Sequence, residues 1–206
     1  MPEQFAQFLP AFLSGLTINF EIAIWSVFGG LLLGSPLAIA RLAGGPIARV
    51  AGGLVAFCRA APTFVVMFFL VNVVPASVSL AGWKISMTPW LAVVLSLTVY
   101  GTAYVSDNAM EPIRQLRKGS PVVALLFLMS LVRAFFVMVL SSGFGAAVGV
   151  VEATTVTLRA IERMPQVSDR LMLIAMVMLM FTVIFQAIYR LIDFLRHRLS
   201  QRLGPA

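Results

Sequence analysis

Five long apolar runs are the feature of this sequence that most limits how it can fold. A helix needs about 20 mainly apolar residues to cross the hydrocarbon core of a bilayer, and these runs meet or approach that length. They cover residues 13–42, 50–74, 90–105, 128–151 and 171–191. The sequence therefore predicts an all-α integral membrane protein with five transmembrane helices in one domain over residues 1–206.

The composition agrees with a membrane protein. Hydrophobic residues make up 60% of the chain, charged residues make up 11%, and the mean hydropathy is +0.98. A soluble domain of this size would not carry so much apolar surface. The net charge of +7 suggests a nucleic-acid partner at first sight, but the basic residues lie between apolar runs and at the C-terminal end. We therefore expect loop charges that set the membrane topology, membrane lipid around the spans, and no nucleic acid.

The longest polar interruption, residues 103–124, lies between the third and fourth runs and is predicted to be a loop. Short basic loops lie mostly on the cytoplasmic side of a membrane. The side that holds this stretch receives Arg41, Arg49, Arg114, Arg117, Lys118, Arg190, Arg196, Arg198 and Arg202, and the other side receives Lys84, Arg159, Arg163 and Arg170. The excess of cations on the first side predicts a cytoplasmic C-terminus and an N-terminus outside.

Cys58 and His197 are the single cysteine and the single histidine. The sequence therefore excludes an intrachain disulfide, and a histidine metal centre or a Ser-His-Asp triad would depend on one residue in a basic tail. The phosphate-binding pattern G-x-x-x-x-G-K-[ST] is absent, so any ATP must bind to a separate chain. We expect no cofactor, no metal and no enzymatic activity. A small membrane-embedded enzyme is the lesser alternative. Such enzymes usually gather several acids or histidines at one face, whereas this sequence has scattered acids and a single histidine.

Four residues near or within the first three runs are candidates for a transport pathway. Glu21 lies near the start of the first run, where it meets either a cationic group or the solvated headgroups. Arg59 is either a pathway or partner contact or an anchor that reaches the interface. Pro62 is predicted to kink the second run, as a gate hinge or as a packing feature. Tyr104 closes the third run, where an aromatic residue commonly lies at the membrane interface.

The fourth run raises a question of length. Residues 121–151 would form a helix of about 46 Å, whereas the hydrocarbon core is about 30 Å thick. If the span begins at residue 121, Arg133 lies near the middle of the membrane, where a charge is unfavourable unless it is paired. If residues 121–128 lie on the cytoplasmic surface, Arg133 lies near the interface, and we favour this arrangement.

Glycines are expected to mark helix contacts in two places. Gly29, Gly30 and Gly34 in the first run would allow another helix to approach closely. Gly145 and Gly149 belong to a G-x-G-x-x-x-G segment that differs from the dinucleotide-binding spacing. They are predicted to form a helix contact surface.

Four short motifs resemble, in order, the permease subunit of bacterial polar amino acid ABC importers. Gly15-Leu-Thr17 is loosely similar to that family's opening G-x-x-x-T, and Arg59-Ala-Ala-Pro62 resembles its R-G-T-P. Ala103-Tyr104-Val-Ser-Asp107, followed by Ile113 and Gly119, resembles A-Y-x-x-E with a later I and G. Gly149-Val-Val-Glu152 resembles G-V-x-E. Together the motifs extend over nearly the whole chain.

The resemblance implies a type I ABC importer permease in the bacterial inner membrane, for amino acids or similar small polar solutes. It implies a pathway formed with a second permease chain, identical or different, an ABC ATPase subunit in the cytoplasm and a periplasmic solute-binding protein outside. The family's loop after the third helix contacts the ATPase, and the resemblance implies that Tyr104 and Asp107 brace this loop. The residues at the matching positions are Asp107, Arg114, Arg117, Lys118, Gly119 and Ala124.

The sequence departs from the family pattern directly after Gly119. In the family an E-A-A-x-x-x-G segment and a proline-containing helix follow, and this coupling helix docks into the ATPase. Here Gly119-Ser-Pro-Val-Val-Ala124 runs straight into apolar sequence. Aligning Gly149 with the family glycine implies a deletion of on the order of 20 residues, or about 30 Å of helix. The alternative function is therefore a degenerate permease paralogue that pairs with an intact subunit and does not itself couple to the ATPase.

Overall fold

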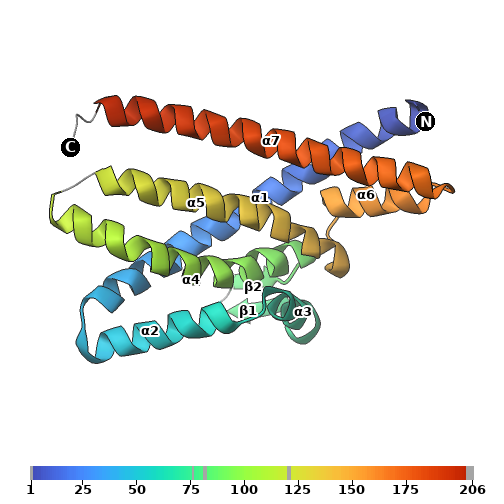
Figure 1. Cartoon of the computed structure of the whole chain (residues 1–206). Helices are drawn as coiled ribbons and strands as arrows, with labels where there is room; N and C mark the ends of the chain where they lie inside the picture. Colours follow the sequence, from blue (N-terminus) through green and yellow to red (C-terminus); the bar gives the residue numbers. More distant parts are fainter. Residues whose placement is uncertain (1, 76, 81–82, 120–121, 203–206) are drawn as a thin grey trace.

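The computed structural model describes residues 2–75, 77–80, 83–119 and 122–202. Figure 1 shows a bundle of long helices with a short hairpin at one end. In chain order the elements are α1 (Pro2–Leu42), α2 (Gly45–Ala60), α3 (Thr63–Val73), β1 (Ser77–Leu80), β2 (Trp83–Ser86), α4 (Pro89–Arg117), α5 (Val122–Ser141), the 3₁₀ helix η1 (Ser142–Val148), α6 (Ala153–Glu162) and α7 (Val167–Arg202). The hairpin pairs antiparallel and is a small departure from the all-α prediction.

Within the described residues, four helices are long and apolar enough to cross a membrane, which makes the chain a multi-pass membrane protein. These candidate spans are Gln7–Leu42, Pro89–Arg117, Phe127–Val148 and Val167–Phe194. The second predicted span, residues 50–74, is instead broken into α2 and α3, whose axes differ by 86°. The predicted total of five is therefore reached only if this bent pair counts as one span.

The bend lies where the sequence predicts a kink. Ala61 and Pro62 both have extended backbone between α2 and α3. Proline disfavours helical backbone in the residue before it and provides no N–H to continue the helix. The two residues therefore end α2 and set the first turn of α3 in a new direction.

The polar stretch after residue 103 is helical, which corrects the prediction of a loop at residues 103–124. α4 continues without a break to Arg117, and only residues 118–121 separate it from α5. Polar composition was an unreliable sign of a loop here, because a helix longer than the bilayer is thick can continue into water. With 29 residues, α4 is about 43 Å long, against about 30 Å of hydrocarbon.

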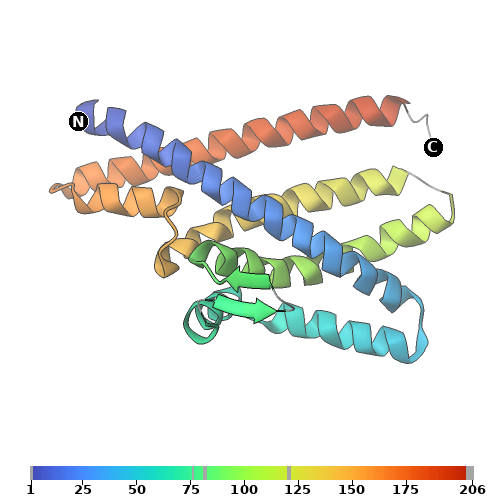
Figure 2. The same cartoon turned by 180° about the vertical axis from the view of Figure 1, so that it is seen from behind.

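The first helix organises the bundle by crossing the other long helices. Seen from behind, α1 runs diagonally from α7 at its N-terminal half to α2 at its C-terminal end (Figure 2). Its most extensive contact is with α4, and glycines make this contact possible. An added Cβ at Gly30 would lie 2.8 Å from the Gly101 carbonyl carbon, and one at Gly34 would lie 2.6 Å from the Thr102 carbonyl oxygen. Only glycine fits at such separations, so the small residues of the first run do form a close helix contact.

Three apolar cores lie along α1. The largest joins α1, α3, α4 and α5 through residues that include Ile22, Met67, Leu97 and Met138. A second joins the N-terminal half of α1 to α6 and α7, and the smallest joins its C-terminal part to α4. Most of α7 is exposed, since only 6% of the residues in its most apolar segment are buried within this chain. Lipid or another chain must cover that surface if the helix spans a membrane.

Candidate functional site

Asp107 on α4 binds two arginines from two other helices. Its Oδ1 accepts a hydrogen bond from Nη1 of Arg41 in the last turn of α1, at 2.8 Å. Its Oδ2 accepts from Nη2 of Arg59 in the last turn of α2, at 2.5 Å. Arg41 also donates to Oγ of Ser106, at 3.1 Å. We call Arg41, Arg59 and Asp107 the arginine–aspartate cluster, and it joins α1, α2 and α4 through one carboxylate.

The cluster is partly open to its surroundings. The side chains of Arg41, Asp107 and Arg59 are 21%, 34% and 59% exposed. Ion pairs with this much exposure contribute at most about 1 kcal/mol each to stability. Two guanidinium groups share one carboxylate, so the cluster has one unbalanced positive charge. Partly exposed ion pairs of this kind can be exchanged for others at a small free-energy change, and they add little to the stability of the helix bundle.

The remaining cations of the predicted ATPase contact lie at the end of α4. Arg114 and Arg117 are exposed in its last turn, and Lys118 is the residue that caps it. The Nη1 atom of Arg114 lies 3.7 Å from Oε2 of Glu111, one turn earlier. The three cations are therefore exposed to the surroundings, and none of them forms an ion pair with Asp107 in the described part of the chain.

The connection from α4 to α5 has only four residues, of which the structure describes Lys118 and Gly119. Gly119 has a φ of +81°, a left-handed conformation that glycine adopts readily. Four residues are too few to form a separate helix between α4 and α5. Ala124, the last predicted residue of this contact, belongs to the first turn of α5, and its side chain lies outside the described residues.

A second carboxylate, Glu152, is fully buried at the N-terminus of α6. It accepts hydrogen bonds from the backbone N–H groups of Thr154 at 2.7 Å and Thr155 at 2.9 Å. It also accepts from Nδ2 of Asn19 on α1, at 2.9 Å. Asn19 Oδ1 in turn accepts from the N–H of Ala153, at 3.0 Å. A carboxylate bound in this way caps α6 and fastens α6 to α1.

The same network reaches the end of α5. Nδ2 of Asn19 also donates to Oγ of Ser142, at 2.7 Å, and Ser142 donates to the carbonyl oxygen of Val139, at 2.7 Å. We call Asn19, Ser142 and Glu152 the buried glutamate network. Glu152 lies in the Gly149-Val-Val-Glu152 motif, but the motif predicted no role for its side chain. The sequence signal for this network was Asn19, because an asparagine within an apolar run needs a hydrogen-bond partner when it is buried.

The other predicted polar residues belong to neither cluster. Glu21 and Arg133 are exposed on α1 and α5, and neither makes a hydrogen bond or ion pair with the described part of the chain. Residues 122–141 form one helix, α5, and Arg133 lies in its second half. The Tyr104 hydroxyl donates to the carbonyl oxygen of Ser130, at 3.1 Å, and so links α4 to α5.

The predicted glycine contact surface is only partly present. Gly145 is buried, and an added Cβ would lie 3.1 Å from Cβ of Val150 and 3.3 Å from Cγ2 of Val93. Gly149 corrects the prediction, because no heavy atom lies within 4 Å of its added Cβ position. It ends η1 with a φ of +92°, so its role is a left-handed turn and not helix packing.

No family model matches the sequence, and no curated protein has significant sequence similarity to it. Among solved structures, the fold is similar to a chain in the crystal structure of an amino acid ABC transporter with histidines. The TM-score is 0.72, the identity is 20%, and the match covers 94% of this chain and 96% of the other.

The MetNI methionine ABC transporter, in inward-facing conformations, is similar in two crystal forms. For the native form the TM-score is 0.63 at 17% identity, covering 96% of this chain and 98% of the other. For the selenomethionine-soaked form the TM-score is 0.66 at 13% identity, covering 95% and 97%. At these identities the similarity establishes the fold. The chain therefore has the fold of an ABC transporter permease, which agrees with the fold expected from the motifs.

Proposed function

We propose that this chain is the transmembrane permease subunit of an ABC-type importer for amino acids or similar small polar solutes. The observation that carries this proposal is the similarity of fold, over 94–96% of the chain, to ABC transporters of amino acids and methionine. The candidate membrane spans and the four ordered motifs support it. In the proposed assembly, a second permease chain completes the pathway in the bacterial inner membrane. An ATPase binds on the cytoplasmic side, and a periplasmic solute-binding protein delivers the solute outside.

The protruding end of α4 is the proposed ATPase contact. The helix is about 13 Å longer than the hydrocarbon core, so its last turns extend beyond the membrane. Those turns carry Arg114 and Arg117, followed by Lys118, and all three side chains are exposed. A row of exposed cations at the tip of a long helix is accessible to acidic groups of a partner.

The arginine–aspartate cluster offers a mechanical link from this contact to the membrane part of the chain. Asp107 lies on α4, ten residues before Arg117, and holds Arg59 at the end of α2. The 86° bend before α3 begins only two residues after Arg59. A movement of α4 would therefore act on α2 directly beside the bend. In this mechanism the bend at Pro62 is the hinge of a gate, and Asp107 transmits the motion.

A degenerate permease paralogue is the second candidate, and one observation favours it. The coupling helix that the resemblance implies has no room between Arg117 and Val122. In that case an intact sister permease transmits the power stroke, and this chain provides only half of the pathway. The two candidates differ in whether an ATPase binds to this chain alone.

Charge reversal at the tip of α4 tests the proposed ATPase contact. The triple variant Arg114→Glu/Arg117→Glu/Lys118→Glu should insert normally in the membrane and should lose most of the ATPase that co-purifies with the chain in mild detergent. The matched control, Arg49→Glu/Arg190→Glu/Arg198→Glu, changes the charge by the same amount at exposed residues of α2 and α7. If the variant at the tip of α4 recovers as much ATPase as the wild type, the tip is not the ATPase contact. If the variant and the control lose the ATPase equally, the loss is a general effect of charge and not of this position.

A further inference from the structure

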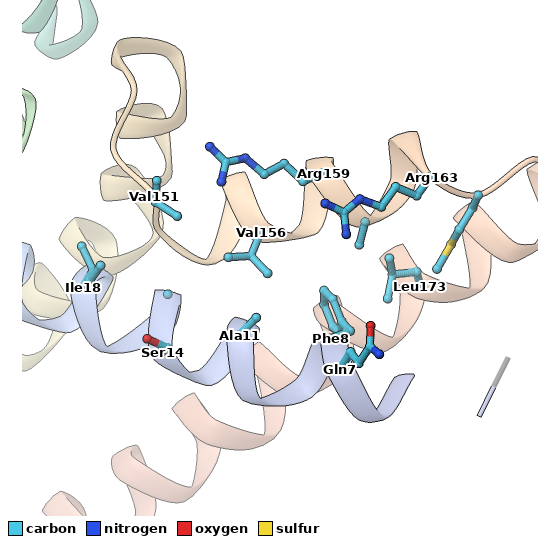
Figure 3. Close-up of a pocket in the computed structure, with 13 residues that line it drawn as sticks. Gln7, Phe8, Ala11, Ser14, Ile18, Val151, Val156, Arg159, Arg163 and Leu173 are labelled. Atoms are coloured by element: carbon cyan, nitrogen blue, oxygen red, sulfur yellow. The ribbon is translucent and has the colours of Figure 1, made fainter. Parts of the chain in front are cut away.

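A cavity of about 620 Å³ lies between the N-terminal half of α1, α6 and the first turns of α7 (Figure 3). Ligand pockets in proteins commonly measure roughly 300–1,000 Å³, so this one is large enough for a ligand of moderate size. None of its lining residues belongs to the arginine–aspartate cluster or to the buried glutamate network. The roles assigned above therefore leave the cavity unexplained.

The cavity combines apolar walls with a cationic edge. Its apolar lining includes Phe8, Ala11, Ile18, Val156, Met164 and Leu173. Phe8, Met164 and Leu173 are buried members of the core that joins α1, α6 and α7. Arg159 and Arg163 also line it, four residues apart on one face of α6. Figure 3 shows both arginine side chains extending from α6 beside the cavity.

The two guanidinium groups are available to a ligand. Both side chains are exposed, and neither makes a hydrogen bond or ion pair with the described residues. The nearby Arg170 differs, because its Nε donates to the carbonyl oxygen of Met164, at 2.7 Å, and so has a structural role. No acidic side chain lines the cavity within the described part of the chain. Among the described residues, the two positive charges at the edge of the cavity therefore have no counter-charge.

The surroundings of the cavity are apolar, as expected for a site that faces a membrane. On α1, Leu9 and Leu13 are 42% and 46% exposed, and on α7, Leu171 and Met172 are each 61% exposed. Along α1, the cavity ends at Ile18, about 35 Å from Arg41. That distance slightly exceeds the roughly 30 Å thickness of the hydrocarbon core. If the arginine–aspartate cluster lies at one membrane boundary, the cavity lies near the headgroups of the opposite one.

We propose that this cavity binds an anionic phospholipid. The phosphate pairs with Arg159 and Arg163, whose planar guanidinium groups match phosphate oxygens well. The beginning of an acyl chain fills the apolar part of the cavity and continues along the exposed side chains of α1 and α7. A small hydrophilic anion would leave the apolar walls unfilled, and a zwitterionic lipid would bring a cation towards two arginines. A small anion and a zwitterionic lipid should therefore both bind to the cavity more weakly than phosphatidylglycerol.

Native mass spectrometry of the purified full-length chain tests the proposal, with phosphatidylglycerol and phosphatidylcholine added in equal amounts. The wild-type chain should retain one phosphatidylglycerol preferentially. In Arg159→Gln/Arg163→Gln its apparent affinity should fall on the order of 30-fold, since each cation near an anionic headgroup contributes about a factor of five. The control Arg49→Gln/Arg190→Gln removes two exposed cations elsewhere and should retain the lipid.

A second pair of variants tests the apolar part and leaves the charges in place. Ala11→Phe fills the cavity from α1 and should also release the lipid, whereas Leu32→Phe, at an exposed residue of the same helix far from the cavity, should not. Equal retention of phosphatidylcholine, or equal loss in the Arg49→Gln/Arg190→Gln control, would overturn the proposal. So would displacement of the lipid by inorganic phosphate at the same concentration, which would indicate a soluble anion. Loss of a co-purifying solute-binding protein from Arg159→Gln/Arg163→Gln, with lipid retention unchanged, would overturn it in favour of a protein contact.

Discussion

Asp107 and Glu152 both fasten α1 to the rest of the bundle, but they do so in opposite ways. Glu152 is fully buried and is bound by neutral donors, including Asn19. Asp107 is one-third exposed and is bound by Arg41 and another arginine. Asn19 and Arg41 are about 33 Å apart along α1, close to the thickness of a bilayer core. One end of the helix is thus held by a buried network and the other by a partly solvated cluster.

This difference indicates which end of α1 can move relative to the rest of the bundle. Breaking the buried glutamate network would leave several polar groups without partners in a water-poor environment, which is strongly unfavourable. Opening the arginine–aspartate cluster exposes charges that water can solvate, so the free-energy change is small. We therefore expect the Glu152 end to act as a fixed anchor. In the proposed mechanism, the Asp107 end, which lies beside the bend and nearer the tip of α4, is the end that moves.

The largest expected effect is loss of stability at the anchor. Glu152→Ala removes one of the two acceptors of the Asn19 amide and leaves the N–H groups of Thr154 and Thr155 without their acceptor. It should destabilise the fold by about 3 kcal/mol or more. Glu152→Gln keeps the shape and should lose less. Thermal unfolding in detergent measures both, with Glu162→Gln, an exposed residue of α6, as the control that should change stability by less than about 0.5 kcal/mol. A small effect of Glu152→Ala would mean that this end is not an anchor.

A smaller effect on stability is expected at the other end. Asp107→Asn should lower the free energy of unfolding by about 1 kcal/mol or less, because its partners are partly exposed. The same variant should reduce solute uptake strongly, because the link between α4 and α2 is lost. Glu111→Gln serves as the stability control, since Glu111 is exposed on the same helix. A destabilisation as large as that of Glu152→Ala would contradict the contrast between the two ends.

The smallest effect is a difference in salt dependence. The Debye length falls from about 10 Å at 0.1 M salt to about 3 Å at 1 M, so exposed ion pairs weaken while buried hydrogen bonds do not. The stability difference between wild type and Asp107→Asn should therefore shrink as salt is raised. The difference between wild type and Glu152→Gln should stay constant. Equal salt dependence of the two variants, measured as unfolding midpoints, would show that the two carboxylates are not held differently.

Patterns that are local in the sequence predicted the fold well. Apolar length located the long helices, Gly30 and Gly34 indicated the close contact with α4, and Pro62 located the bend. The extent of α4 was missed, because polarity was taken as a sign of a loop although the helix continues to Arg117. The motifs predicted the permease fold that the solved structures share.

The chemistry of the two clusters was largely out of reach of the sequence. Asn19 and Glu152 are 133 residues apart, and nothing in either local segment indicates the other as its partner. Arg41 was counted only as a charge that sets topology, although it binds Asp107. The motifs did include Arg59 and Asp107, but only the fold shows that these two residues form an ion pair.

ATP-driven uptake tests the central claim most directly. This chain would be reconstituted in proteoliposomes with the ATPase and any second permease from its own gene cluster, and uptake of labelled amino acids would be measured with the cognate binding protein. The account predicts uptake that requires this chain and ATP, and that falls sharply in Asp107→Asn. Equal uptake when this chain is omitted would contradict the proposal that it forms part of the pathway.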